Sequence, residues 1–257
     1  TTPKGKAAAR LAVRLLDANG RAVAQKNLTA NAQGTAAVQL NIANAKAWSP
    51  EQPYLYTLEV SLYQGNKLAD RLRQRVGIRT VAVSKEHGFQ LNGQSRKFKG
   101  VCLHHDLGPL GAAVNKAAII RQIRLMKDMG VDAIRTSHNM PSQMQMQVCD
   151  SMGMMVMAES FDAWKEPKVK NGYNLFYDQW WRKDLENLIR GHRNHPSIVM
   201  WSIGNEIPEQ WNKEGAQRAK DMTDYCHQLD NTRPVTCGGD NPKANTECGF
   251  YAALDVP

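Results

Sequence analysis

Asn205 and Glu206 place an amide and a carboxylate at the end of a predicted strand in this chain of 257 residues. They follow a nearly unbroken apolar run from Ile198 to Ile203, which a proline precedes and a glycine ends. Such a run predicts a strand covered on both faces, and the ligands of parallel α/β sheets bind at the carboxyl ends of the strands. Glu206 is therefore a candidate proton donor at the mouth of a site. The alternative is that its side chain caps the helix that follows.

Three other predicted strands also deliver polar or aromatic residues at the same end. The strands are 98–102, 131–135 and 154–158, and the residues at their ends are His104-His105-Asp106, Arg135 to His138, and Glu159 to Trp164. Helix capping alone does not explain four consecutive strands that end in this way. Because such ends meet at one side of a sheet or barrel, the pattern predicts an active site there.

The elements that would position these residues alternate between strand and helix after Val81. A helix capped by Asn115 presents its apolar residues on one face until Gly130 stops it. Further helices are predicted at 142–152, 177–193 and 215–229, and further strands at 198–203 and 234–237. Repeated βα units of this kind predict a parallel sheet or an eight-stranded barrel.

The first part of the chain has short β-like segments instead. They lie at 11–16, 36–40, 56–63 and 68–76, with turns at 17–20 and 64–66. Several short strands joined by turns that contain glycine and asparagine predict an antiparallel sandwich.

The net charge of +9 is concentrated in this first part. Residues 1–100 contain 16 Lys and Arg against 5 Asp and Glu, whereas residues 101–257 contain 17 against 19. Arg71, Arg73 and Arg75 alternate on one side of a predicted strand, which indicates a solvated face that also discourages edge pairing. No aromatic residues alternate with these arginines, and no helix that could serve as a recognition helix is predicted beside them. A nucleic-acid partner is therefore not expected.

The composition is that of a soluble globular protein, with 42% hydrophobic and 22% charged residues. No apolar stretch approaches the roughly 18 residues of a membrane span, so membrane insertion is not expected. The first residues, Thr1 to Lys4, lack the apolar core of a signal peptide, although a leader could precede them. Five cysteines without CxxC spacing indicate buried free thiols and not a zinc site or a disulfide framework.

Several stretches resemble glycoside hydrolase family 2, the family of β-galactosidases, β-glucuronidases and β-mannosidases. The longest runs from Arg193 to Glu206 and reads RNHPSIVMWSIGNE, and shorter ones are 134–138 and 150–157. Residues 76–79 resemble the family's junction between an immunoglobulin-like sandwich and its catalytic barrel. Residues 99–105 and 137–139 most resemble the β-galactosidase branch, particularly its secreted or periplasmic bacterial forms.

The resemblance implies a multidomain protein that combines a β domain with an α/β domain. A small immunoglobulin-like β-sandwich is expected at 1–79. An incomplete (β/α)8 TIM barrel is expected at 80–257, with strands one to five and the start of the sixth.

The resemblance also implies a retaining cleavage of terminal β-glycosides, first of all β-galactosides. Glu206 matches the family's general acid/base, which protonates the leaving oxygen and then removes a proton from water. Asn205 matches the residue that hydrogen-bonds the sugar 2-hydroxyl. His104 and His138 match histidines that contact the sugar, and Arg135 matches an arginine that orients the nucleophile. A β-glucuronidase, a β-mannosidase and a non-catalytic carbohydrate-binding homologue remain as alternatives.

Two of these assignments have structural alternatives. Arg135 could pair with Glu159 or Asp132 only to stabilise the fold. Trp164 could form an aromatic platform for a sugar or a hydrophobic lid, and the sequence does not separate the two.

A metal or another cofactor is not expected. His104, His105 and His138 could form the metal site of a barrel hydrolase, but the HxH motif of such enzymes is absent and sugar contact is favoured. In magnesium-using β-galactosidases the segment after the third strand supplies a Glu and a His ligand, which residues 160–165 do not match.

The resemblance predicts a catalytic pair of which this chain contains one member. A retaining glycosidase needs a second carboxylate about 5–5.5 Å from the first, and the family carries it at the end of the seventh strand. Residues 253–257 are predicted to begin the sixth. We therefore expect an interior piece of a longer enzyme that does not turn over substrate alone. Its expected partner is a carbohydrate, and homo-oligomerisation of the full-length enzyme is left open.

Overall fold

The computed structural model describes residues 9–31 and 34–257, which form two compact units. The first unit contains the described residues up to Trp48 together with Gln52–Ile78. The second contains Ser49–Glu51 and Arg79–Pro257. Within the described ranges, no helix is both long enough and apolar enough to cross a bilayer.

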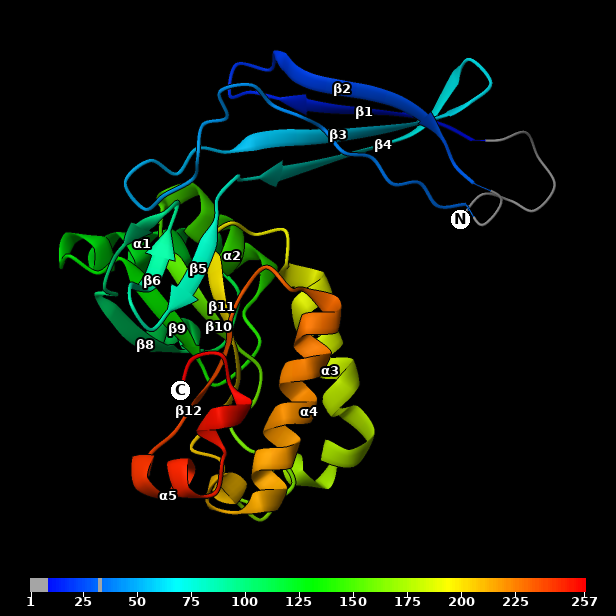
Figure 1. Cartoon of the computed structure of the whole chain (residues 1–257). Coiled ribbons are helices and arrows are strands. Elements are labelled where there is room, and N and C mark those ends of the chain that lie inside the picture. Colours follow the sequence, from blue (N-terminus) through cyan, green and yellow to red (C-terminus); the bar gives the residue numbers. More distant parts are fainter. Residues whose placement is uncertain (1–8, 32–33) are drawn as a thin grey trace. The chain divides into compact units, whose positions relative to one another are not determined.

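The first unit is built on a four-stranded antiparallel sheet in the order β2-β1-β3-β4 (Figure 1). The strands are β1 Arg10–Leu16, β2 Ala22–Thr29, β3 Tyr56–Gln64 and β4 Lys67–Val76. Between β1 and β2, the Asp17 carboxylate accepts hydrogen bonds from the amides of Asn19 and Arg21, both at 2.9 Å. This local acceptor stabilises the turn that the sequence predicts.

Two strand expectations for this unit are wrong. The strand expected at 36–40 does not form, because this segment pairs with no neighbouring strand although its apolar residues alternate. Conversely, β2 is a strand that the pattern does not predict, since most of its residues are exposed and Gln25, Lys26 and Asn27 follow one another without an apolar residue between them. It forms because it pairs with β1 from end to end. Whether each segment forms a strand depends on a neighbouring strand to pair with, which the local sequence pattern does not reveal.

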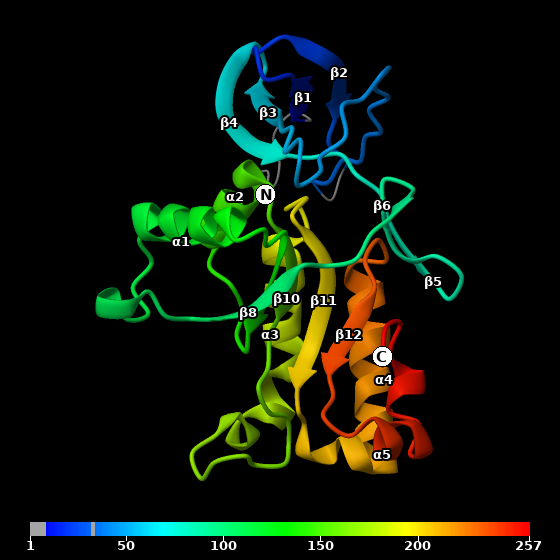
Figure 2. The ribbon, with the colours of Figure 1, turned by 90° about the vertical axis from the view of Figure 1, so that its left-hand side faces the viewer.

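The second unit begins with a three-stranded antiparallel sheet and continues as a five-stranded parallel sheet in the order β12-β11-β10-β9-β8 (Figure 2). The antiparallel sheet, which the sequence pattern does not predict, contains β5 Val81–Ser84, β6 Gly88–Leu91 and β7 Gln94–Ser95. The parallel strands are β8 Gly100–His104, β9 Ala133–Ser137, β10 Met155–Glu159, β11 Ile198–Asn205 and β12 Val235–Gly238. A single parallel bridge joins Thr236 to Val256, in the segment predicted to begin a sixth strand.

The helices follow the parallel strands in the predicted alternation. They are α1 Lys116–Asp128, α2 Gln143–Met152, α3 Tyr177–His192, α4 Lys213–Leu229 and α5 Pro242–Glu247. The 3-10 helices are η1 Gly108–Leu110, η2 Tyr173–Leu175, η3 Pro208–Trp211 and η4 Tyr251–Ala253. The side chain of Asn115 caps α1 by accepting from the amide of Ala118 at 3.0 Å, and Ser142 caps α2 in the same way. These caps satisfy amides that have no partner within the helix.

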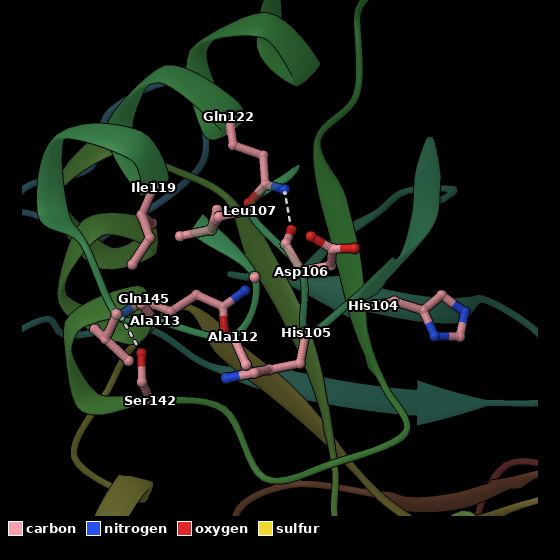
Figure 3. Close-up of a pocket in the computed structure, with 12 residues that line it drawn as sticks. His104, His105, Asp106, Leu107, Ala112, Ala113, Ile119, Gln122, Ser142 and Gln145 are labelled. Carbon is pink, nitrogen blue, oxygen red and sulfur yellow. Dashed lines mark hydrogen bonds between the residues drawn. The ribbon is translucent and has the colours of Figure 1, made fainter. Parts of the chain in front are cut away.

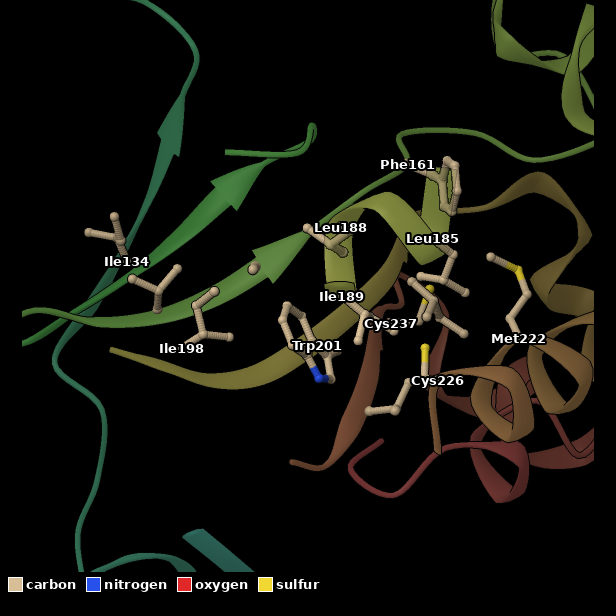
Figure 4. Packing of buried hydrophobic residues seen from close by; sticks show 14 of the residues in the cluster. Ile134, Phe161, Leu185, Leu188, Ile189, Ile198, Trp201, Met222, Cys226 and Cys237 are labelled. Atoms are coloured by element: carbon tan, nitrogen blue, oxygen red, sulfur yellow. The ribbon is translucent and has the colours of Figure 1, made fainter. Parts of the chain in front are cut away.

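A continuous apolar core joins the parallel sheet to α1–α4. Figure 4 shows the part of it that lies between the sheet and helices α3 and α4. Its fully buried members include Ile123 of α1, Met146 of α2, Leu188 of α3, Met222 of α4 and Trp201 of β11. All eight residues of β11 are buried, as its unbroken apolar run predicts. An open hollow of about 170 Å³ with a mainly apolar lining lies against β8–β11.

The cysteines are free thiols, and most are shielded from solvent. Cys149, Cys226 and Cys237 are buried, and burial raises the pKa of each thiol. Cys248 is partly buried. Cys102 is exposed, contrary to the expectation of buried thiols, because it lines the open hollow and not the core.

A buried polar cluster fixes the chain where it enters β11. Asp150 of α2 accepts from the Ser197 hydroxyl at 2.6 Å and lies 2.5 Å from Nδ1 of His195. Arg233 donates to the carbonyl oxygens of Ile198 at 2.7 Å and His195 at 3.0 Å. These hydrogen bonds offset the cost of burying charged groups and hold the start of β11 in place.

His192 at the end of α3 is buried in its neutral form. Its ring lies 5.6 Å from that of His195, centroid to centroid. Burial, and then the neighbouring His195, lowers the pKa of His192 from 6.5 to about 4. The folded chain therefore keeps this imidazole neutral at pH values where the unfolded chain protonates it.

The free energy of unfolding is expected to fall as the pH drops from 6.5 towards 4, because the unfolded chain then takes up a proton at His192 that the folded chain does not. The lowered pKa corresponds to at most about 3 kcal/mol. Urea unfolding of wild type and His192→Gln at pH 7 and pH 4.5 measures this contribution. The variant should lose less stability on acidification, whereas His87→Gln, at an exposed site, should behave as wild type. An equal loss in His192→Gln and wild type would exclude His192 as the source.

Candidate active site

Glu159, the last residue of β10, is the centre of a polar cluster at the carboxyl ends of the parallel strands. Its side chain is fully buried. Its Oε2 accepts from Nε of Arg135 at 2.8 Å and from the Ser202 hydroxyl at 2.5 Å, and its Oε1 lies 2.6 Å from Nδ1 of His138. Its backbone amide donates to the Thr136 hydroxyl at 3.0 Å. One carboxylate thus joins β9 and β11 to β10 and holds two side chains that the sequence assigns to the site.

Arg135 connects Glu159 to Asn205. Its Nη2 donates to Oδ1 of Asn205 at 2.8 Å. Burial alone would lower the pKa of Arg135, but the charge of Glu159 and the hydrogen bond to it outweigh this effect and raise the pKa. Gly238 leaves space for the guanidinium, since a Cβ there would lie 2.4 Å from Nη2. Of the two structural partners considered for Arg135, Glu159 is the one observed, and Asp132 pairs with another arginine.

The side-chain amide of Asn205 is held on its other side by Asp162, and Lys168 contacts both this carboxylate and the Asn205 backbone. Nδ2 of Asn205 donates to Oδ1 of Asp162 at 3.0 Å. Nζ of Lys168 donates to the same carboxylate oxygen at 2.9 Å and to the Asn205 carbonyl at 2.7 Å. Burial would raise the pKa of Asp162, but these hydrogen bonds outweigh it and lower the pKa. Arg135, which donates to Oδ1, and Asp162, which accepts from Nδ2, together fix the orientation of the Asn205 amide. One N–H and one lone pair of the amide remain for another molecule.

Glu206 follows directly, with an exposed side chain and a left-handed backbone at φ 43°. This conformation is uncommon for a residue other than glycine. It is held by a hydrogen bond from the Glu206 amide to the Gly238 carbonyl at 2.7 Å. The capping alternative is wrong: η3 has no side-chain cap, and α4 is capped by Asn212. The carboxylate therefore remains free to act on another molecule.

His104 and His138 lie together, as their positions at neighbouring strand ends predict. Their ring centroids are 5.1 Å apart at an interplanar angle of 89°. Because a carboxylate only accepts, the contact with Glu159 places a proton on Nδ1 of His138. Beside His104, a small cavity of about 30 Å³ is lined by His105, Asp106 and residues of α1 and α2, with the His104 ring turned away from those helices (Figure 3).

Trp164 does not offer a ring face to a sugar. It is fully buried, its Nε1 donates to the Ile203 carbonyl at 2.8 Å, and its ring lies 5.9 Å from that of Phe250. Gly204 allows this close packing, since a Cβ there would lie 3.0 Å from Nε1. Of the two alternatives for Trp164, the aromatic sugar platform, on which its assignment to substrate binding rests, is therefore corrected: the buried ring packs beneath the end of β11.

Comparison with known proteins decides the family. Residues 81–255 match the family model described as "Glycosyl hydrolases family 2, TIM barrel domain", and residues 2–79 match "Glycosyl hydrolases family 2". The chain belongs to glycosyl hydrolase family 2. The fold class expected from the sequence is thereby confirmed: a small immunoglobulin-like β-sandwich precedes part of a TIM barrel.

Individual family 2 proteins are similar along nearly the whole chain. The β-galactosidase BoGH2A of Bacteroides ovatus is 38% identical, over 94% of this chain and 32% of that protein. A putative β-glucuronidase of Formosa agariphila is 40% identical, over 90% of this chain and 22% of that protein. A solved family 2 member from Bacteroides cellulosilyticus superposes with a TM-score of 0.92 at 39% identity, over 98% of this chain and 33% of that one. The chain thus spans about a third or less of the length of these relatives.

This family 2 site contains no evident metal centre in the parts of the chain that the structure describes. There, no group of three or more histidine, cysteine, aspartate or glutamate side chains is arranged to hold an ion. In particular, His104 and His138 meet through their ring faces and edges, without a third ligand of this kind.

Three side chains of this family 2 site are missed by the sequence. Ser202 and Thr136, which position Glu159, are polar residues inside apolar strands, and that contrast could have revealed them. Lys168 lies in a loop with no periodic pattern, so no signal in the sequence reveals its contact with Asn205.

Proposed function

We propose that the second unit carries the acid/base half of the active site of a retaining β-glycosidase. Glu206 protonates the glycosidic oxygen as it leaves and then removes a proton from the water that attacks the glycosyl-enzyme intermediate. One observation carries the proposal: an exposed Glu206 carboxylate follows an Asn205 side-chain amide that Arg135 and Asp162 hold at the carboxyl end of β11. Carboxyl ends of barrel strands are where enzymes of this fold bind substrate.

We infer the roles of the neighbouring side chains from the hydrogen-bond donors and acceptors that they have left. Asn205 uses its remaining N–H or lone pair to bind the sugar 2-hydroxyl. His138 presents Nε2 to a hydroxyl while Glu159 holds Nδ1 at 2.6 Å, and His104 adds a second sugar contact. Arg135, already paired with Glu159, orients the nucleophile. Carbohydrate is accordingly the proposed partner of this unit.

The nucleophile is proposed to lie outside residues 1–257. Retention requires a second carboxylate about 5–5.5 Å from the acid/base. In this chain Glu159 and Asp162 are engaged by Arg135, Ser202 and Lys168, which suits positioning groups better than a nucleophile. The length of the relatives is consistent with a contribution from a further segment.

We propose a β-galactoside as the substrate, on the similarity to the protein named β-galactosidase BoGH2A. A β-glucuronide is the second candidate, because relatives of similar identity are named β-glucuronidases. A β-mannoside and a non-catalytic carbohydrate-binding role remain further alternatives.

Hydrolysis of 4-nitrophenyl β-galactoside, β-glucuronide and β-mannoside by the longer protein that contains these residues tests the assignment. We expect kcat/KM for the galactoside to exceed the others by about tenfold or more, since hydroxyl recognition discriminates strongly. A preference for the glucuronide would select the second candidate, and binding without turnover would favour the non-catalytic role. Residues 1–257 alone should not turn over these substrates. Turnover by them that Glu206→Gln abolishes would show that they contain a nucleophile.

A further inference from the structure

The sheet of the first unit carries a row of arginines on one face. In the register of the sheet, Arg14 of β1 lies opposite Glu59 of β3, which in turn lies opposite Arg73 of β4. Alternate residues of a strand point to the same face, so Arg71 and Arg75 share this face with Arg73. Three guanidinium groups, those of Arg14, Arg71 and Arg73, thus surround a single glutamate, and Arg75 lies opposite Thr57 on the same face.

Glu59 is buried among these arginines and does not neutralise them. Its side chain is 3% exposed and lies 2.8 Å from Nε of Arg73, 3.3 Å from Arg14 and 4.0 Å from Arg71. The hydrogen bond from Arg73 outweighs burial and, with the nearby positive charges, lowers the pKa of Glu59. Glu59 is therefore ionised at neutral pH and contributes one negative charge. The arginines contribute four positive charges, and their side chains remain 43–60% exposed where they pair with Glu59.

A groove of about 470 Å³ lies beside this arginine face. Arg73 and Arg75 line it together with Thr57 and Asp17. Oδ1 of Asp17 accepts from two backbone amides of its own turn, at 2.9 Å each. The groove lining combines the two guanidinium charges of Arg73 and Arg75 with the single carboxylate charge of Asp17. The charge that the groove offers to a ligand is consequently positive.

We propose that this face binds an acidic polysaccharide whose sugars carry carboxylates, a polyuronide. A guanidinium presents a planar fork that pairs with a carboxylate through two parallel hydrogen bonds. Arg71, Arg73 and Arg75 follow one another at roughly 6.6 Å along β4, which suits a polymer with repeated charges and not a single small anion. The site is separate from Glu206 and does not depend on the glycosidase proposal.

A nucleic acid fits this face less well. The described part of the unit contains no helix that could enter a groove of a duplex. Tyr63, an aromatic residue in register with this face, already has the Arg10 guanidinium 4.4 Å above its ring centre, so it is not free to stack on a base.

Binding of fluorescein-labelled polygalacturonate to residues 1–257, followed by fluorescence anisotropy at low salt, tests the proposal. Arg71→Gln with Arg75→Gln removes two positive charges but keeps Arg14 and Arg73 on Glu59, so the fold should survive. The dissociation constant is expected to rise about tenfold or more. Arg71→Lys with Arg75→Lys should give an intermediate value, because it keeps the charge and loses the fork.

The matched control is Arg121→Gln with Arg124→Gln, which removes two exposed arginines of α1 and should leave binding within about twofold. Equal weakening in the control and the Arg71/Arg75 variant would overturn the proposal. So would equal binding of neutral dextran. Tighter binding of DNA than of polygalacturonate at the same salt concentration would assign the face to nucleic acid instead.

Discussion

Glu206→Ala is expected to lower kcat/KM for a phenyl β-galactoside by about 10²–10⁴-fold in a protein that contains these residues together with the proposed nucleophile. The phenolate leaves poorly without a proton, and Glu206 is the exposed carboxylate that would supply it. A 2,4-dinitrophenyl leaving group needs little protonation, so its release in the first step should be far less affected. The contrast between the two leaving groups separates loss of proton donation from general damage to the site.

Azide provides a second, independent readout of the same variant. The second half-reaction needs a base to activate water, which Glu206→Ala lacks. Azide needs no base and should accelerate turnover of the dinitrophenyl substrate, with formation of the β-glycosyl azide. Glu214→Ala, which removes an exposed carboxylate at the start of α4, should keep wild-type rates. If both substrates slow equally and azide has no effect, Glu206 is not the acid/base.

Glu159→Gln is expected to lower the free energy of unfolding by about 3–5 kcal/mol, more than any other substitution proposed for this chain. The fully buried carboxylate neutralises Arg135 at 2.7 Å and accepts hydrogen bonds from His138 and Ser202. The amide has a similar shape but no charge, so a partly buried guanidinium remains without its counter-ion. Urea unfolding of residues 1–257 measures the change.

The control for Glu159 is an ion pair of similar length on the surface. Lys220 and Asp224 lie 2.7 Å apart on α4 with more than half of each side chain exposed, and Asp224→Asn should cost no more than about 0.5 kcal/mol. Combining Glu159→Gln with Arg135→Met should recover part of the lost stability, because no unpaired charge is left. A cost for Glu159→Gln no larger than that for Asp224→Asn would contradict the argument.

The local pattern predicts those parts of the fold whose stabilising partners are close in sequence. Asn115 is identified as a cap because it accepts a hydrogen bond from an amide three residues away. β11 is identified because an unbroken apolar run indicates a strand that is buried on both faces. The pattern misses β2 and wrongly predicts a strand at 36–40, because strand formation depends on a partner elsewhere in the chain.

The same distinction applies to the site. The sequence by itself determined that Asn205 and Glu206 stand at the end of a buried strand, and which other strand ends carry polar groups. The tertiary structure decided what these groups do to one another: Glu159 joins Arg135 to His138, Lys168 reaches Asn205, and the Trp164 ring is buried. The apolar pattern of the sequence shows where a strand ends, and therefore which residues lie at its end. Which atoms then meet depends on the packing of segments 20 to 70 residues apart, for which the chain carries no local signal.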